Sequence, residues 1–152
     1  GASVVHVDSS RGMVDWAKEN AAASGLSDRP IRYIVDDVIK FVKREIRRGH
    51  KYEAIVMDPP SYGRGSNGEV WNIEKNLAEL IDLCMELLVD DPLFFIINSY
   101  TTGLSSSVLG NLLKLAMGNK YDGEITTGEL GLPIKNKNLV LPCGIYGRYE
   151  SK

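Results

Sequence analysis

The sequence has 152 residues, of which 43% are hydrophobic and 25% are charged, and its formal net charge is -2. These values are typical of one globular domain and disfavour disorder, and no run approaches the ~20 apolar residues of a membrane span. The overall charge gives no case for nucleic-acid binding, which would need a local basic patch or parts outside this chain.

Strand-like and helix-like patterns alternate along the chain. Three of the β-rich runs end in acids, and between the runs apolar residues recur at helical spacing, which predicts helices with one apolar face. In the first helix the apolar face is formed by Met13, Trp16, Ala17 and Ala21, and the helix is expected to stop at Gly25. The predicted strands are 3–7, 31–35, 54–57, 93–97, 123–133 and 139–150, and the predicted helices are 13–24, 38–48, 73–88 and 104–117.

Four alternations of strand and helix predict an α/β fold with a Rossmann-like, mostly parallel sheet that has helices on both faces. The last two strands, around the basic turn 134–138, predict an antiparallel hairpin at the edge of that sheet. In such sheets, ligands bind beyond the carboxyl ends of the strands. The residues that follow the first three strands are therefore candidates for a site.

Acids stand at each of these three strand ends. Asp8 has the two acceptor oxygens that a ribose requires, although with Ser9 and Ser10 it could instead only cap the next helix. Asp37 could accept from a purine amine while the Val38 N–H faces a ring nitrogen. Here too a helix N-cap is the alternative.

Asp36 is a second candidate for the contact with a purine amine, beside Asp37. After the third strand, "DPPSY" combines Asp58 with two residues that lack a backbone donor, so Pro59 and Pro60 would present free carbonyl acceptors beside a cleft. Ser61 follows them, and Tyr62 could stack on a base. A sharp turn without any further role is the alternative.

The stretches "VVHVDSS", "VDDV", "VMDPPSYGRG" and "LPCGIYGR", in this order, resemble class I S-adenosylmethionine-dependent methyltransferases. The nearest group is the ribosomal RNA large-subunit methyltransferases, whose members carry a PUA-type RNA-binding domain before the catalytic domain. The resemblance implies that Asp8, with Ser9, holds the cofactor ribose and that Asp36 or Asp37, with Val38, holds the adenine.

The resemblance further implies a catalytic turn near the methionine end of the cofactor and the target atom. Its residues are Asp58, Pro59, Pro60, Ser61 and Tyr62. The implied substrate is RNA, specifically a base of ribosomal RNA, and the implied cofactor is S-adenosylmethionine.

The sequence departs from this family in two respects. The family's first strand and its glycine-rich loop are absent, so 1–152 is expected to be part of a catalytic domain. Such a part is expected to bind the cofactor only weakly by itself. It would also leave an unpaired strand edge, which homo-oligomerisation could cover. Where members with a cysteine nucleophile carry it, this chain has 98–101, "NSYT". Direct transfer to a nitrogen is therefore favoured.

The two cysteines, Cys84 and Cys143, make no metal-ligand pattern, so no metal is expected, and their separation favours a reduced, cytoplasmic setting. The basic residues of 40–51 are expected to form a solvated helix face, and Lys135 and Lys137 to mark an ordinary turn, although either group could approach RNA. An NAD-dependent oxidoreductase and a non-catalytic nucleotide- or RNA-binding fragment remain alternative functions.

Overall fold

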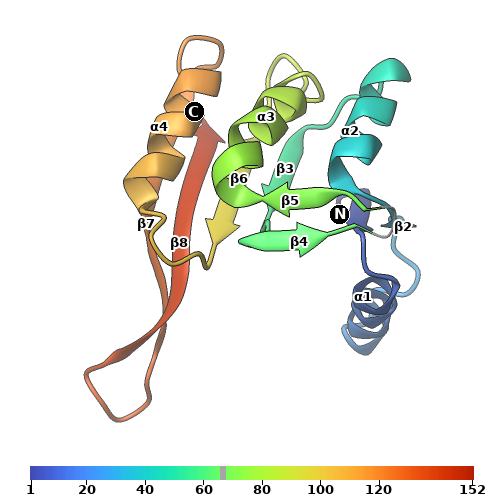
Figure 1. Cartoon of the computed structure of the whole chain (residues 1–152). Helices are drawn as coiled ribbons and strands as arrows, with labels where there is room; N and C mark the ends of the chain where they lie inside the picture. Colours follow the sequence, from blue (N-terminus) through green and yellow to red (C-terminus); the bar gives the residue numbers. More distant parts are fainter. Residues whose placement is uncertain (66–67) are drawn as a thin grey trace.

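A computed structural model describes residues 1–65 and 68–152. Figure 1 shows helices and strands alternating along most of the chain, with a long hairpin at the C-terminal end. The elements are β1 (Val4–Asp8), α1 (Arg11–Ala23), β2 (Ile31–Val35), α2 (Val38–Arg47), β3 (Ala54–Met57), β4 (Tyr62–Arg64), β5 (Val70–Asn72), α3 (Ile73–Met85), β6 (Phe94–Ser99), α4 (Ser106–Met117), β7 (Gly123–Pro133) and β8 (Val140–Ser151).

The pairing of the strands confirms the predicted α/β class. β1 pairs with β2, and β3 pairs with β6, both in parallel, while β8 lies antiparallel between β6 and β7. Within the described residues, however, the parallel pairs belong to separate sheets, because the order is β1–β2 in one and β3–β6–β8–β7 in another. The ladder is therefore interrupted between β1 and β3.

The hydrophobic core lies where α3 and α4 pack side by side over β6 and β8 (Figure 1). Phe95 and Ile97 of β6 are fully buried, as alternation along a strand with one covered face requires. Leu109 and Leu113 of α4 meet them from the helix side. Burial of each such side chain contributes about 1.5–3 kcal/mol, so this sheet and its two helices hold most of the fold's apolar stabilisation.

Helix α1 differs from the prediction in the face that it buries. Met13 and Trp16 are 48% and 57% exposed, and only Val14 of this helix is fully buried. Ala17 and Ala21 do lie on the partly buried side. The periodicity was compatible with two adjacent faces, and the larger side chains lie on the one that no described element covers.

A small hairpin occupies part of the segment 58–72, to which the sequence analysis assigned no strand or helix. β4 and β5 pair antiparallel, with Gly63 opposite Trp71, and residues 66 and 67 lie outside the described residues. Ser61 and Ile73 join the hairpin to the start of α3, since the Ile73 N–H donates to the Ser61 carbonyl at 3.1 Å. The hairpin is thereby fixed beside the Asp-Pro-Pro turn.

Glu45 of α2 is a fully buried carboxylate, 0% exposed, at the amino end of the sheet. It accepts hydrogen bonds from Tyr52 Oη at 2.7 Å and Arg48 Nη1 at 3.3 Å, and it lies 2.7 Å from His50 Nδ1. Burial alone would raise its pKa, but these partners together lower the pKa of Glu45 to about 2. Burial, together with the hydrogen bond to the Glu45 carboxylate, raises the pKa of Tyr52 to about 12.

The β7–β8 hairpin extends beyond the rest of its sheet. Ser99, the last residue of β6, pairs with Ile145, so the residues of β8 before Ile145 continue past the carboxyl end of β6. We call residues 130–143 the arm; it projects at the lower left of Figure 1. At its base, Gly144 has a φ of +110°, and a Cβ there would lie 2.4 Å from the Ser99 carbonyl oxygen, so only glycine fits.

No helix in the described part of the chain is long and apolar enough to cross a membrane. A cytoplasmic location stays a prediction.

Candidate functional site

The ends of β1 and β2 bring the first acids together. The Asp36 N–H donates to the Asp8 backbone carbonyl at 3.1 Å, which extends the parallel ladder by one step and places the two residues side by side. The Asp8 carboxylate accepts from the Ser10 N–H at 2.7 Å. Ser10, rather than Asp8, is the N-cap of α1. The bond from the Ser10 N–H closes a tight turn and uses one oxygen of the Asp8 carboxylate, and the other oxygen has no polar partner among the described residues.

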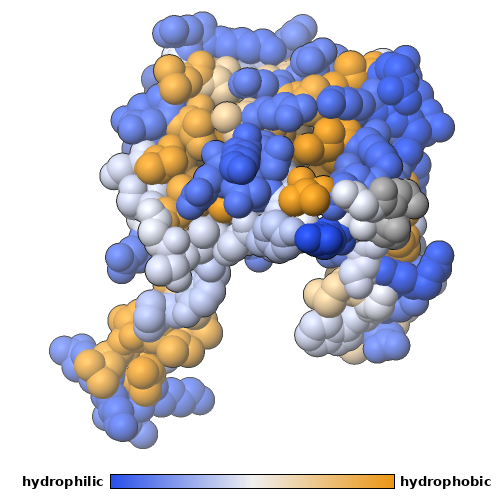
Figure 2. Space-filling model, viewed as in Figure 1, coloured by the Kyte–Doolittle hydropathy of each residue, from blue (hydrophilic) through white to orange (hydrophobic). Residues whose placement is uncertain are grey.

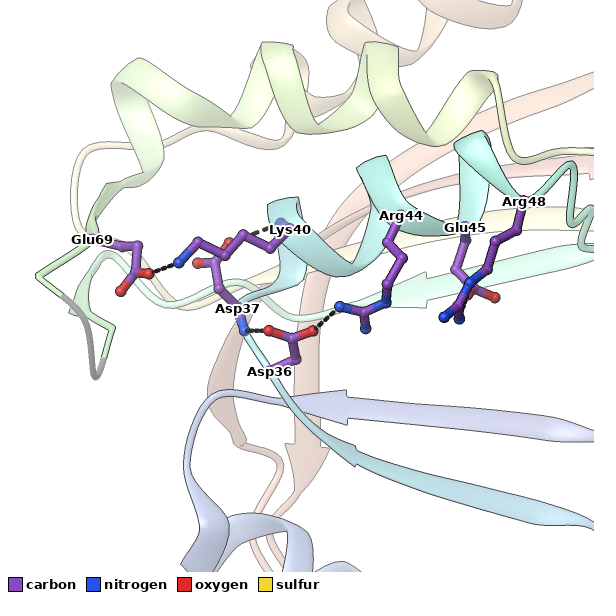
Figure 3. Close-up of polar contacts among 7 residues, drawn as sticks. All are labelled: Asp36, Asp37, Lys40, Arg44, Glu45, Arg48 and Glu69. Carbon is purple, nitrogen blue, oxygen red and sulfur yellow. Dashed lines mark hydrogen bonds and ion pairs between the residues drawn. The ribbon is translucent and has the colours of Figure 1, made fainter.

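The two acids before α2 have different local partners (Figure 3). Asp37 is the N-cap of α2 and accepts from the Lys40 N–H at 2.9 Å, as the helix-cap alternative predicted. Asp36 accepts from the Asp37 N–H at 2.9 Å and pairs with Arg44 NH1 at 2.6 Å. Both side chains are thus held in fixed orientations at the start of the helix.

A hollow of about 150 Å³ lies between the end of β1, the start of α2 and the β4–β5 hairpin. It is bordered on one side by an ion pair between Lys40 and Glu69, which joins the hairpin to α2 (Figure 3). Drug-sized ligands fill roughly 300–1,000 Å³, so this space suits one part of a larger ligand, such as a base or a ribose. The residues that line it are Ser9, Val35, Asp36, Asp37, Lys40, Gly65 and Glu69.

Asp58 ends β3 on the same carboxyl edge but does not line this hollow. Its side chain is exposed and makes no polar contact with any described residue. The prediction that both proline carbonyls are free is wrong for Pro60, whose carbonyl accepts from Trp71 Nε1 at 2.6 Å. The indole of β5 needs an acceptor, and a carbonyl in a turn without a neighbouring donor provides one. The Pro59 carbonyl has no such partner among the described residues.

Hydroxyl groups link the Asp-Pro-Pro turn to the end of β6. Ser61 Oγ lies 2.8 Å from Thr101 Oγ1, and Ser99 Oγ donates to the same oxygen at 3.0 Å. Ser99 is 2% exposed, so this chain of hydroxyls runs from the core to the surface of the turn. Tyr62 is 53% exposed beside it and presents an accessible ring.

The basic face of α2 is exposed to solvent, as expected, and most of its charges are also paired with acids. Lys40 pairs with Glu69, and Lys43 pairs with Glu79 at 3.3 Å. Arg44, Arg48 and His50 pair with Asp36 and Glu45. Glu69 lies in the loop before β5 and Glu79 in α3, so the Lys40 and Lys43 pairs tie α2 to its neighbours, while Asp36 and Glu45 are local partners.

Cys84 is buried in α3, and burial raises its pKa to about 12, so its thiol is not ionised at neutral pH. Cys143 is exposed on the arm, where its thiol donates to the Leu141 carbonyl at 3.4 Å. No group of three or more metal-binding side chains occurs among residues 1–65 and 68–152.

The structure therefore gathers Asp8, Ser9, Asp36 and Asp37 around one end of β1 and β2, with the Asp58 turn on the same edge. Sequence reasoning missed the contributions of Lys40, Glu69, Trp71 and Thr101. All four act through partners 11 to 40 residues away, in three contacts, and a local pattern does not reveal such pairs.

Known proteins resemble this chain in sequence and in fold. No family model matches the sequence. Ribosomal RNA large subunit methyltransferase K of Neisseria meningitidis serogroup B is 30% identical over 113 residues, which are 74% of this chain and 31% of that protein. The chain thus spans less than a third of the length of this curated relative.

Solved structures share the fold over the whole chain. A SAM-dependent methyltransferase from Agrobacterium tumefaciens has a TM-score of 0.92 and 37% identity, covering 100% of this chain and 50% of that one. A proposed methyltransferase in complex with S-adenosylhomocysteine (SAH) has a TM-score of 0.71 and 19% identity, and the match covers 95% of this chain and 38% of that one. At this identity, the likeness is evidence for a shared fold only.

Proposed function

We propose that this chain, which is related in sequence and fold to S-adenosylmethionine-dependent methyltransferases, is part of a catalytic domain that methylates a base of ribosomal RNA. The observation that carries the proposal is the gathering of Asp8, Ser9, Asp36 and Asp37 at one edge, beside a hollow of about 150 Å³. The alternative of an NAD-dependent oxidoreductase gains no support, since it gives the Asp58 turn no role.

The acids suit the nucleoside part of the cofactor. The unpartnered oxygen of Asp8 would accept from a ribose hydroxyl. The Asp37 carboxylate uses one oxygen to cap α2 and offers the other to an adenine amine, while the Val38 N–H, in the first helical turn, has no partner among the described residues and would donate to a ring nitrogen. Arg44 holds Asp36 in place beside them.

The Asp58 turn suits the reacting end. S-adenosylmethionine supplies a methyl group on a sulfonium sulfur. The exposed Asp58 carboxylate and the Pro59 carbonyl are acceptors without a polar partner among the described residues, so they would hold an amine in one orientation. Trp71 and Thr101 fix the turn that carries them, and Tyr62 offers a face for a base. Orientation of donor and acceptor in line supplies much of the acceleration in such a reaction.

We infer direct transfer to a nitrogen, without a covalent enzyme–base adduct. A cysteine nucleophile reacts as a thiolate, and the Cys84 thiol is buried with a pKa of about 12. Cys143 is exposed at the base of the arm and donates to the Leu141 carbonyl, with no basic partner among the described residues.

Two substitutions in the intact protein test these roles separately. Asp8→Ala should raise the Kd for S-adenosylhomocysteine, measured by calorimetry, by about tenfold, a loss of about 1.4 kcal/mol. Asp58→Asn should leave that Kd within about threefold and lower the rate of labelled-methyl transfer to ribosomal RNA by roughly a hundredfold. Asp28→Ala, in an exposed turn, is the matched control. An unchanged transfer rate in Asp58→Asn would refute the assigned role.

A further inference from the structure

Within the described residues, no element covers the arm and no ion pair involves it. Every residue from 131 to 143 is exposed. Figure 2 shows the arm standing away from the body of the molecule, with apolar side chains along it and polar groups at its end. Such an exposed, extended feature is characteristic of a surface that meets a partner.

The charge of the arm differs from that of the rest of the chain. The arm contains two lysines and none of the chain's 20 aspartates and glutamates. Lys135 and Lys137 make no ion pair with any described residue, in contrast to the basic residues of α2, most of which are paired with acids. A protein with a net charge of -2 thus carries free positive charge at the tip of its arm.

The tip also offers hydrogen-bonding groups. Asn136 and Asn138 flank the second lysine, and each amide can both donate and accept. Asn136 has a φ of +60°, which turns the chain tightly and presents consecutive polar side chains at one end. The turn is closed by the Ile134 N–H, which donates to the Leu139 carbonyl at 3.0 Å.

Apolar residues of the arm pair across its two strands. Leu132 faces Leu141 and Pro133 faces Val140, so cross-strand contacts stiffen a ribbon that has no helix against it. The ribbon is continuous with β7 and β8 of the main sheet, which anchors it. At about 3.3 Å per residue, the four steps from Glu129 to Pro133 carry the paired strands about 13 Å past the end of β6, and the turn 134–138 lies beyond them.

The arm leaves the sheet on the same edge as the candidate site. β6 ends at Ser99, whose hydroxyl connects through Thr101 to Ser61 of the Asp-Pro-Pro turn, and the arm begins opposite Ser99. A large substrate with one base at that turn would therefore extend along this edge, toward the arm.

We propose that the arm is an RNA-binding element, in which Lys135 and Lys137 contact phosphates flanking the base to be modified. This proposal rests on the proposed function, since it names how the substrate of the same site is held. Phosphate contacts of this kind supply affinity and register, without specifying sequence.

The test compares the intact protein with Lys135→Ala/Lys137→Ala in binding to large-subunit ribosomal RNA at several salt concentrations. We expect roughly tenfold weaker binding near 0.1 M salt and a slope of log K against log salt reduced by about 1.5, because two phosphate contacts are lost. The Kd for S-adenosylhomocysteine should stay unchanged. Arg47→Ala/Lys114→Ala removes two charges from the last turns of α2 and α4, at the opposite edge, and should bind RNA like the wild type.

Two results would overturn the proposal. One is an arm variant that binds RNA with the wild-type affinity and salt slope. The other is an Arg47→Ala/Lys114→Ala control that weakens RNA binding as much as the arm variant does, which would assign the effect to overall charge and not to the arm. If the wild type fails to transfer a methyl group, the proposed function is contradicted. The proposal for the arm is tested separately, by the difference in RNA binding between the wild type and the variants.

Discussion

Replacing Glu45 with Gln removes the fully buried charge of α2 while keeping the volume of the side chain. The lowered pKa of Glu45, from 4.5 to about 2, corresponds to about 3.4 kcal/mol at 1.36 kcal/mol per pH unit. His50 and Arg48 are 50% and 54% exposed, and solvent screens their contribution. We therefore expect E45Q to lower the free energy of unfolding of the intact protein at pH 7 by about 2 kcal/mol.

The pH dependence distinguishes this mechanism from a simple packing defect. Because the pKa of Glu45 is lower in the folded state, its contribution is present above pH 4.5 and is lost as the pH falls toward about 2. Gln does not titrate. The difference in stability between the wild type and E45Q should therefore be largest above about pH 5 and shrink steadily below pH 4.5.

Urea denaturation at pH 7, 5, 4 and 3 measures both quantities. Glu19→Gln, at an exposed position of α1, is the control and should change stability by less than about 0.5 kcal/mol. The reasoning is refuted by an E45Q protein as stable as the wild type at pH 7, or by a gap that stays constant from pH 7 to pH 3.

Three further predictions follow from single contacts. Trp71→Phe removes the hydrogen bond to the Pro60 carbonyl and should reduce methyl transfer about tenfold with little change in S-adenosylhomocysteine binding; equal transfer would show that the bond is not needed. Gly144→Ala should destabilise the intact protein by about 1–3 kcal/mol in thermal unfolding, because of its φ of +110° and the nearby Ser99 carbonyl. Iodoacetamide should label Cys143 and spare Cys84 in the folded protein, as mass spectrometry can check.

The sequence predicted the strands of the fold more reliably than its helix faces. The run 31–35 and the run 54–57 match β2 and β3 residue for residue, because short β-branched runs ended by acids are unambiguous. In α1 the apolar spacing gave no sign of which side would be covered, and Trp16 lies on the exposed side. The β4–β5 hairpin escaped detection because strands of three residues, among polar and glycine residues, show no alternation.

Site residues could be predicted from the sequence only where their place at the end of a strand is enough to bring them to the site. Asp8 and Asp58 could be placed because each ends a strand, and the carboxyl ends of parallel strands meet at one edge. Their surroundings depend on long-range partners, such as the Lys40–Glu69 pair and the Trp71 bond to the turn. These contacts exist only once the hairpin has folded against α2.

The interruption of the ladder between β1 and β3 has a mechanical consequence. Asp8 and Asp36 lie at the end of one sheet and the Asp58 turn at the end of the other, and no strand hydrogen bond couples the two sheets within the described residues. A molecule that bound at both sheet ends would therefore join two sheets that no strand ladder connects. Amide hydrogen exchange along β1 and β3 should slow together when such a molecule binds.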